Sequence, residues 1–355
     1  MPTPDYPPQS ICILRLSALG DVTHVVPVVR SLQEHWPETR ICWIIGVAGY
    51  RLLQALPGVE FIVHDKRGGW QAIRELHAAL RDRSFDVLLH MQVAARANLL
   101  SRLVRAPLRL GWNRARSRDF HHCFINHAVA DIPFQHQVQG FLEFPRALGL
   151  HVEQPRWDLP VSAEAVQWVR RQIDPQRRTL VISPCSRHVL RNWPAGHFAT
   201  VADFAAGDLG VQVVLSGGPG QLERDTGAAI ERAMQCECIN LIGQDTLEQS
   251  KALLQQADVV ISPDSGPAHI ASALGTPVIG LYAPTWSRRS GPYNSLELCV
   301  DHFARAARRY RRREPEDLRW GTRIEVPGVM DLIQPHEVIT ALRRWQEHGA
   351  TAAPR

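Results

Sequence analysis

The chain has 355 residues, of which 45% are hydrophobic and 21% are charged, a composition typical of soluble globular proteins. This length exceeds that of one ordinary domain, and no collagen-like period, low-complexity block or short solenoid repeat interrupts it, so two globular domains are predicted. The net charge of +5 favours an acidic partner, but the arginine clusters are not interleaved with aromatic side chains, so no nucleic-acid partner is predicted.

The first eight residues are polar and rich in proline, so they have neither the basic start nor the apolar stretch of a signal peptide. No apolar run in the chain approaches the roughly 20 residues that cross a bilayer. We therefore expect a cytoplasmic protein. Its seven cysteines are scattered without zinc-site spacing, which predicts reduced thiols and no bound metal or cofactor.

The first half of the chain alternates short apolar segments with longer amphipathic ones, the pattern of strand–helix units that build a parallel sheet. Strands are predicted at residues 11–16, 41–45, 59–64 and 86–91, and helices at 22–35 and 70–81. This half is therefore predicted to be a doubly wound α/β domain.

The first predicted strand runs into a glycine-containing turn and a helix, with the sequence Arg-Leu-Ser-Ala-Leu-Gly-Asp at residues 15–21. The turn lacks the glycines of the G-x-G-x-x-G dinucleotide fingerprint. Asp21 is predicted at the carboxyl edge of the strand, where a carboxylate can cap the helix or take a proton from a hydroxyl nucleophile. Both roles stay open from the residues alone.

The alternation lapses at residues 151–162, a segment with two prolines that is predicted to be a linker. We place an N-terminal domain at 1–155, a second domain at 156–335, and a C-terminal helix and tail at 336–355. In the second domain, strands are predicted at 179–183, 211–216, 238–241, 259–262 and 277–282, with a helix at 249–257.

Two loops of the second half have residues suited to a phosphorylated ligand. Residues 183–194 form a polar, basic loop after a strand, in which Arg191 could neutralise the charge of a leaving group or could be an ordinary surface arginine. Residues 216–223 form a glycine-rich bend, where the small residues would let backbone approach a nucleotide and Glu223 could accept hydrogen bonds from ribose. A plain turn is equally consistent with this second loop.

The segment at residues 261–277 is a strand, a polar turn and a helix that Gly275 ends. Asp264 or Ser265 can cap the helix, and the backbone N–H groups at its first turn suit a diphosphate. His269 is predicted on that first turn, beside the anion site, although a lone histidine is more often structural.

Taken together and in this order, residues 15–21, 191–194, 217–220 and 264–269 resemble glycosyltransferase family 9, whose best-known members are the heptosyltransferases of lipopolysaccharide core assembly. The resemblance covers residues 10–300. It implies an α/β fold of GT-B architecture, with two Rossmann-like domains facing a central cleft and a C-terminal helix closing the molecule. It also implies inverting, metal-independent transfer of a sugar from a nucleotide sugar, ADP-heptose, to a lipopolysaccharide-core or related glycolipid acceptor.

The resemblance assigns roles to individual residues. Asp21 would be the general base on the acceptor hydroxyl, and Arg191 would stand near the diphosphate. The expected contacts of the nucleotide sugar are Ser186, Gly218, Glu223, Asp264, Ser265, Gly266 and His269. The family often carries methionine directly before the motif histidine, where this chain has Ala268. Residues 286–293 do not have a form that assigns the chain to one subfamily, and residues 301–328 lie outside the common pattern.

The first half is the acceptor domain of the family, so its arginines Arg96, Arg114 and Arg116 are expected to hold an anionic glycolipid. The arginine run at residues 305–313 is expected to assist peripheral contact with the cytoplasmic face of the inner membrane. Two alternatives stay open: a transferase of the same fold that uses another nucleotide sugar, and a non-catalytic two-lobed ligand-binding protein.

Overall fold

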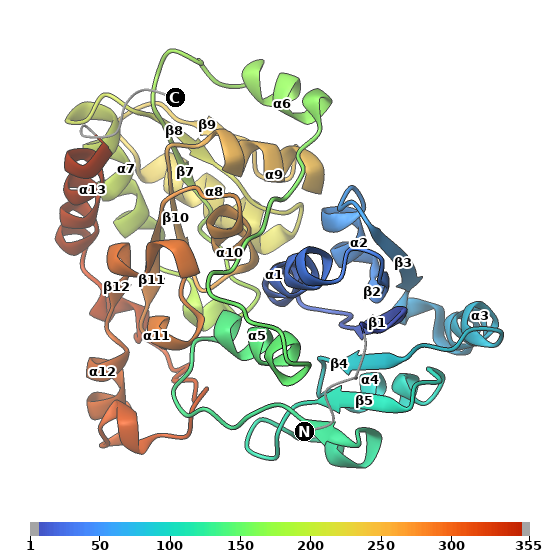
Figure 1. The fold of residues 1–355 in the computed structure, drawn as a ribbon. Helices are drawn as coiled ribbons and strands as arrows, with labels where there is room; N and C mark the ends of the chain where they lie inside the picture. Colours follow the sequence, from blue (N-terminus) through green and yellow to red (C-terminus); the bar gives the residue numbers. More distant parts are fainter. Residues whose placement is uncertain (1–6, 350–355) are drawn as a thin grey trace. The chain divides into compact units, whose positions relative to one another are not determined.

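The computed structural model describes residues 7–349, so residues 350–355 of the expected C-terminal tail lie outside the described residues. The chain divides between Pro160 and Val161 into two compact units (Figure 1). This division falls within residues 151–162, which contain no helix or strand before α6 begins at Ala163. Each unit contains one six-stranded sheet, and every strand pair in both sheets is parallel.

The sheet of the first unit has the strand order β3-β2-β1-β4-β5-β6. Its strands are β1 (Ser10–Leu14), β2 (Arg40–Gly46), β3 (Val59–His64), β4 (Val87–His90), β5 (Leu108–Gly111) and β6 (His127–Ala128). Every residue of β1 and β4 is buried, as expected for central strands that helices cover on both faces. The four predicted strands correspond to β1–β4. The sequence does not predict β5 and β6, because these short strands have no sustained apolar run.

The helices of the first unit are α1 (Leu19–His35), α2 (Val47–Leu53), α3 (Gly69–Leu80), α4 (Ala95–Ser101) and α5 (Gln137–Ala147). One face of the sheet packs Cys12 and Leu14 against Leu76 of α3 and Leu100 of α4. Because side chains alternate along a strand, Ile13 faces the other way. α1 packs against both α2 and α5.

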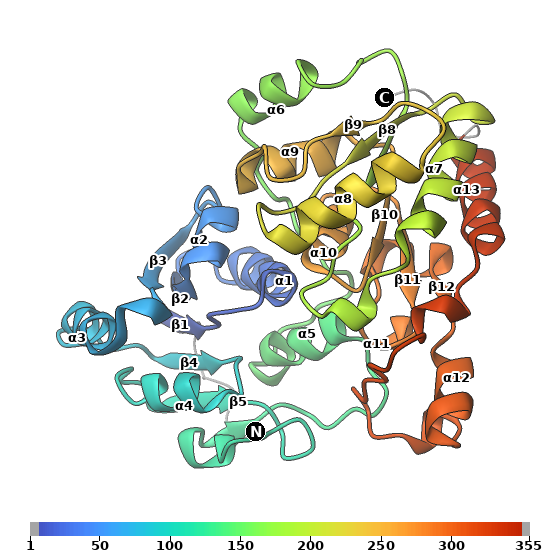
Figure 2. The same cartoon turned by 180° about the vertical axis from the view of Figure 1, so that it is seen from behind.

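The sheet of the second unit has the order β12-β11-β10-β7-β8-β9 (Figure 2). Its strands are β7 (Thr179–Ile182), β8 (Gln212–Leu215), β9 (Ile239–Asn240), β10 (Val259–Pro263), β11 (Val278–Tyr282) and β12 (Val300–Asp301). The five predicted strands correspond to β7–β11, each within a few residues, and β12 is not predicted. The strands of this sheet that carry the candidate site, β7, β10 and β11, are buried along their whole length.

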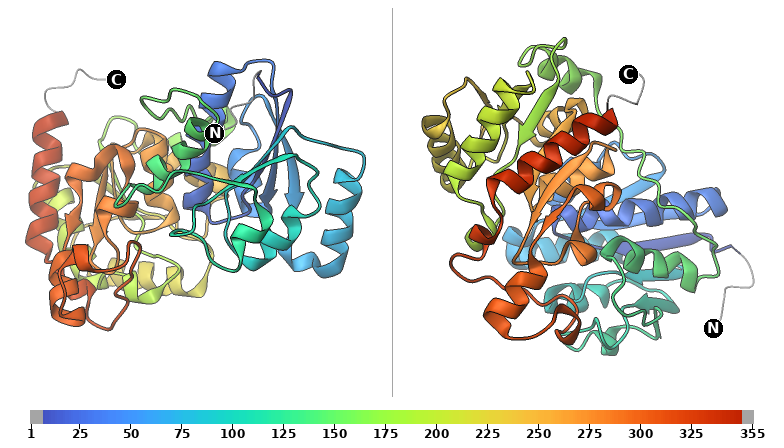
Figure 3. Two further views of the ribbon diagram at one scale, coloured as in Figure 1. Left: turned by 60° about the horizontal axis from the view of Figure 1, so that its bottom comes forward. Right: turned by 90° about the vertical axis from the view of Figure 1, so that its left-hand side faces the viewer.

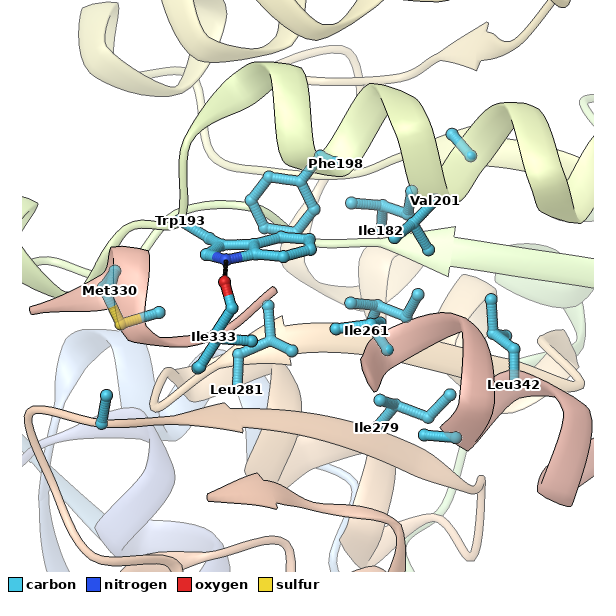
Figure 4. Close-up of a cluster of buried hydrophobic side chains, with 14 of the residues drawn as sticks. Ile182, Trp193, Phe198, Val201, Ile261, Ile279, Leu281, Met330, Ile333 and Leu342 are labelled. Atoms are coloured by element: carbon cyan, nitrogen blue, oxygen red, sulfur yellow. Dashed lines mark hydrogen bonds between the residues drawn. The ribbon is translucent and has the colours of Figure 1, made fainter. Parts of the chain in front are cut away.

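The helices of the second unit are α6 (Ala163–Arg170), α7 (Ala195–Gly207), α8 (Gln221–Ala233), α9 (Leu247–Gln256), α10 (Gly266–Ala273), α11 (Ser287–Ser290), α12 (Phe303–Ala306) and α13 (Pro335–Gly349). Trp193 is buried in a large apolar core in this unit, where it packs on Phe198 with ring centroids 5.0 Å apart (Figure 4). The Trp193 indole N–H donates to the carbonyl of Ile333 over 3.1 Å.

The C-terminal helix α13 packs against α7 and lies along the second unit (Figure 3). Its side chains Val338, Leu342 and Trp345 are buried in the core that surrounds Trp193. The prediction of two Rossmann-like halves and a C-terminal helix is confirmed. No helix within residues 7–349 combines the length and the apolar character that a membrane crossing needs.

Candidate active site

In the first unit, the turn between β1 and α1 places Asp21 on the first turn of α1. Its carboxylate accepts a hydrogen bond from the Ala18 backbone N–H over 3.2 Å, so Asp21 does cap the helix. The same carboxylate forms an ion pair with Arg15 and accepts a bond from the Gln137 side chain at the start of α5. The Asp21 side chain nevertheless keeps 24% of its surface exposed, so a ligand can reach it.

The backbone of this turn is fixed by the neighbouring strands. Leu16 N–H donates to the Gln92 side chain over 2.7 Å, and the Leu16 carbonyl accepts from Gly46 N–H over 3.1 Å. A Cβ at position 46 would lie 2.4 Å from that carbonyl oxygen, so only glycine fits there. Arg15 is anchored by a 2.6 Å bond to the Met91 carbonyl and by packing on the ring of Phe141. The carboxylate of Asp21 is therefore held by groups that are themselves immobilised.

The three arginines expected to bind acceptor differ in their surroundings. Arg96 and Arg114 are exposed, and Arg96 makes one 3.3 Å bond to the Lys66 carbonyl. Arg116 is half-buried: it donates to the Ile132 carbonyl and the Gln135 side chain, both over 2.9 Å, and burial lowers its pKa.

In the second unit, Asp264 at the end of β10 joins two side chains expected from the sequence. Its Oδ2 accepts from Arg191 Nη1 over 3.1 Å, and its Oδ1 lies 3.5 Å from His269 Nε2. Burial by itself raises the pKa of the Asp264 carboxyl, but the contacts with His269, Arg191 and Thr285 outweigh burial and hold it below its usual value. The structure thus brings the basic loop and the β10–α10 turn together.

Glu325 completes this cluster, and the sequence did not predict it. Its Oε1 accepts from Arg191 Nε over 2.8 Å and lies 2.7 Å from Arg191 Nη2, while Oε2 lies 3.5 Å from His188. The preceding residue, Ile324, is fully buried and donates its N–H to the Pro284 carbonyl, which fixes the position of Glu325. Only 12% of the Arg191 side chain is exposed, so both carboxylates hold it in a fixed orientation.

The start of α10 is ordered through serine hydroxyls. The hydroxyls of Ser265 and Ser262 are 2.7 Å apart, and the Ser265 side chain makes no capping bond to α10. Ser186 donates its hydroxyl to the Asp264 carbonyl over 3.0 Å, which ties the basic loop to this turn. The side chain of the capping residue Ser265 therefore accepts no hydrogen bond from the backbone N–H groups of the first turn, which starts at Gly266. An anion site requires such N–H groups.

Glu223, on the first turn of α8, folds back over the glycine-rich turn at residues 217–220. A Cβ at Gly220 would lie 2.2 Å from Glu223 Oε2, and a Cβ at Gly218 would lie 3.8 Å from Oε1. Its charge also contributes to the raised pKa of Cys185, after the larger effect of burial, so Glu223 lies near the basic loop. Within residues 7–349, no three His, Cys, Asp or Glu side chains gather closely enough to hold a metal ion.

Comparison with known proteins identifies the family of this chain. The model of glycosyltransferase family 9 (heptosyltransferase) matches residues 73–317, well over half of the chain. The chain belongs to glycosyltransferase family 9. The lipopolysaccharide core heptosyltransferase OpsX of Haemophilus influenzae is 36% identical over 344 residues, which cover 97% of this chain and 99% of that protein. The lipopolysaccharide heptosyltransferase 3 of Escherichia coli K12 is 25% identical, covering 75% of this chain and 80% of that protein.

Solved structures agree on the fold. A family 9 glycosyl transferase from Veillonella parvula superposes with a TM-score of 0.78 at 20% identity, covering 96% of this chain and 97% of that chain. The ADP-heptose lipopolysaccharide heptosyltransferase II of E. coli gives a TM-score of 0.74 at 22% identity, covering 96% and 100%. The chain therefore has the GT-B-like heptosyltransferase fold, as predicted.

The family match also shows why Glu325 is hard to predict from sequence. Glu325 follows the matched residues 73–317 and lies 134 positions after Arg191 in the chain. No local pattern links two residues so far apart. Gln137 is likewise far from Asp21 in the chain, 116 positions later, and only the packing of α5 on α1 brings it to the carboxylate.

Proposed function

We propose that this protein transfers heptose from ADP-heptose to a lipopolysaccharide-core acceptor, as an inverting, metal-independent glycosyltransferase. The observation that carries the proposal is the cluster of Asp264, Arg191 and His269 beside the start of α10, which lies within the region that matches the family model. The extent of the similarity to a lipopolysaccharide core heptosyltransferase, 97% of this chain at 36% identity, supports the same activity.

In this proposal, the second unit binds the donor. Arg191 offers five N–H donors, of which the bonds to Asp264 and Glu325 use three, so two remain for phosphate oxygens. A guanidinium held in this way stabilises the charge that grows on the diphosphate as it leaves. The N–H groups at the start of α10 and the His269 ring contribute further contacts to the diphosphate, and Glu223 accepts hydrogen bonds from the ribose.

The first unit is proposed to bind the acceptor and to activate it. Asp21 takes the proton from the acceptor hydroxyl as that oxygen attacks the anomeric carbon and the bond to ADP breaks. Arg15 and Gln137 direct their donors at the carboxylate, which matches its ionised form because that form only accepts hydrogen bonds. Attack from the side opposite the leaving diphosphate inverts the anomeric centre.

An anionic acceptor fits the exposed arginines of the first unit. Arg96 and Arg114 can pair with its phosphate or carboxylate groups, whereas the Arg116 guanidinium already donates to neighbours within the unit. The role of Arg116 in acceptor binding stays a prediction. We further propose that the protein works at the cytoplasmic face of the inner membrane, with residues 305–313 near anionic lipid.

The decisive experiment supplies the purified protein with ADP-heptose and a heptose-deficient lipopolysaccharide, and measures release of ADP together with the mass of the product. Acceptor-dependent ADP release and a mass gain of one heptose support the proposal. Parallel reactions with other nucleotide sugars test the donor, and EDTA tests metal independence. Tight ADP binding without turnover of any nucleotide sugar would instead favour a non-catalytic binding protein.

A further inference from the structure

Three large apolar side chains of the first unit are exposed to solvent. Trp70, Phe120 and Leu99 are 81%, 76% and 66% exposed, which makes them the three most exposed large apolar side chains within residues 7–349. Single exposed apolar residues are ordinary on protein surfaces. Their exposure needs an explanation only if the three side chains share one surface.

All three residues follow the carboxyl end of a strand in the same parallel sheet. Trp70 lies on the first turn of α3, which follows β3, Leu99 lies on α4, which follows β4, and Phe120 lies in the segment after β5. The carboxyl ends of parallel strands meet at one edge of a sheet. Asp21, which follows β1, belongs to the same edge.

Contacts between these segments hold them beside one another. Arg96, on the first turn of α4, donates to the Lys66 carbonyl in the turn before α3 over 3.3 Å. Asn98, also on α4, donates its side-chain N–H to the Asp119 carbonyl in the segment after β5 over 2.8 Å. α3 and α4 also cover the same face of the sheet. The helix that carries Leu99 therefore joins the other two segments.

The backbone holds Phe120 in its exposed position. Asp119 and Phe120 have φ angles of 54° and 56°, in the left-handed region that bulky residues rarely adopt. The Asp119 side chain accepts from the Ala95 N–H over 3.0 Å, which fixes this turn against α4. Strained backbone of this kind is found mainly where a side chain has a function.

The chain around these side chains is basic. Residues 87–118 contain seven arginines and no aspartate or glutamate. Five of these arginines are exposed: Arg96, Arg102, Arg105, Arg114 and Arg118. Near Trp70, Lys66 is exposed, whereas Arg67 is paired with Asp65. Exposed tryptophan, phenylalanine and leucine among basic side chains are typical of surfaces that lie on anionic bilayers.

We propose that this edge of the first unit docks on an anionic lipid bilayer, with Trp70, Leu99 and Phe120 inserted among the lipids and exposed arginines against the headgroups. A second copy of the chain is a poorer occupant, because a symmetric contact would bring two basic surfaces together. Where the inference rests on the proposed function, the bilayer presents its lipid-anchored acceptor at the edge that carries Asp21. Apolar insertion in the first unit is added to the charge contact proposed for residues 305–313.

Flotation of the full chain with lipid vesicles tests the docking surface. Vesicles of equimolar phosphatidylcholine and phosphatidylglycerol should bind the protein about tenfold or more tightly than phosphatidylcholine alone, since several basic side chains lie near the headgroups. The triple variant Trp70→Gln, Leu99→Gln, Phe120→Asn should bind the anionic vesicles about tenfold or more weakly. Asparagine tolerates the positive φ at position 120, and thermal unfolding checks that the variant keeps the fold.

The matched control is Val189→Gln in the second unit. This valine is the next most exposed large apolar side chain within residues 7–349, at 57%, and its loss should change vesicle binding by less than about twofold.

Phosphatidylcholine brominated on its acyl chains separates insertion from attraction to the surface. In mixed vesicles with phosphatidylglycerol, the bromine atoms should quench part of the tryptophan fluorescence of the wild type. Trp70→Phe should lose that part of the quenching and still bind. Equal quenching in the two proteins would overturn the insertion of Trp70.

The docking surface is refuted if the wild type binds no vesicles, or if the triple variant binds anionic vesicles like the wild type. Sedimentation without lipid tests the other occupant: a dimer that only the wild type forms would assign the surface to a second copy and overturn the bilayer.

Heptosyl transfer keeps this inference apart from the proposed function. The triple variant should be slower with an acceptor embedded in vesicles and should keep the wild-type rate with a deacylated, water-soluble acceptor. An equal loss with both acceptors would make the three side chains part of the acceptor site and overturn the docking role. Vesicle binding without any transfer would contradict the proposed function and leave the docking surface standing.

Discussion

Acidification from pH 7.5 to pH 5 is expected to destabilise the first unit by about 4 kcal/mol, because two buried histidines there are held uncharged. His90 Nε2 and His121 Nδ1 both lie 2.9 Å from Asn98 Oδ1, and the Trp112 N–H donates to His121 Nε2 over 3.1 Å. In this arrangement each ring carries one proton, directed at Asn98. Gly111 makes room for the pair, since a Cβ there would lie 2.6 Å from His121 Nε2.

The magnitude follows from the two pKa values. Burial and the neighbouring His121 lower the pKa of His90 from 6.5 to about 3, and burial with His122 lowers that of His121 to about 4. At pH values between these pKa values and 6.5, the unfolded chain binds protons that the folded chain excludes. The two histidines therefore cost no stability above pH 6.5, and the free energy of unfolding falls as the pH drops below that value. A pH of 5 lies about 1.5 units below the unfolded pKa of 6.5, and each unit corresponds to about 1.4 kcal/mol. Each histidine therefore lowers the free energy of unfolding by about 2 kcal/mol at pH 5.

Hydrogen exchange followed by mass spectrometry measures this locally, through the peptide that contains the Trp112 amide. His90→Gln keeps a donor for Asn98 without a titrating ring, so it should remove about half of the pH dependence. The matched control is His151→Gln, whose side chain is 84% exposed in the wild type and which should change nothing. Equal protection at pH 7.5 and pH 5, after correction for intrinsic exchange, would refute the reasoning, as would a His90→Gln protein with the wild-type pH dependence.

Four further predictions concern the reaction. Asp21→Asn should lower turnover by about 10²-fold or more while ADP affinity in calorimetry stays unchanged; equal turnover would leave Asp21 as a helix cap only. Arg191→Ala should lower kcat more than it weakens ADP binding, since leaving-group charge grows in the transition state, and a raised donor KM at constant kcat would contradict this. His269→Ala should mainly weaken ADP binding, measured by the same calorimetry; unaltered affinity would make His269 structural. Arg114→Glu should raise the acceptor KM at low salt and less at high salt, whereas the exposed control Arg170→Glu should not.

The parts of the site that the sequence predicts are those that lie close together in the chain. Asp264 and His269 share one strand–helix junction, and the rule that ligands bind at the carboxyl ends of parallel strands identifies that junction without a structure. Glu325 could not be predicted in this way, because its contact with Arg191 depends on how the chain after β12 returns past the β11–α11 loop.

Arg116 illustrates the limit for charged residues. It belongs to an arginine-rich stretch that favours an exposed, anion-binding surface, but its guanidinium packs 5.5 Å from the Trp112 ring and over α5. The position depends on Gly140, where a Cβ would lie 2.7 Å from Arg116 Nη1. The burial of Arg116 therefore depends on Gly140 in helix α5, and no hydrophobic periodicity in the sequence predicts this contact.

The place of α13 in the core has a consequence for how the protein is made. The ribosome synthesises α13 about 150 residues after Trp193 and Phe198, yet Leu342 and Trp345 of α13 belong to the same buried cluster as these two residues. The second unit therefore cannot complete its core until α13 has left the ribosome. The first unit, which ends at Pro160, has all its strands and helices much sooner and can fold while the rest is still being translated.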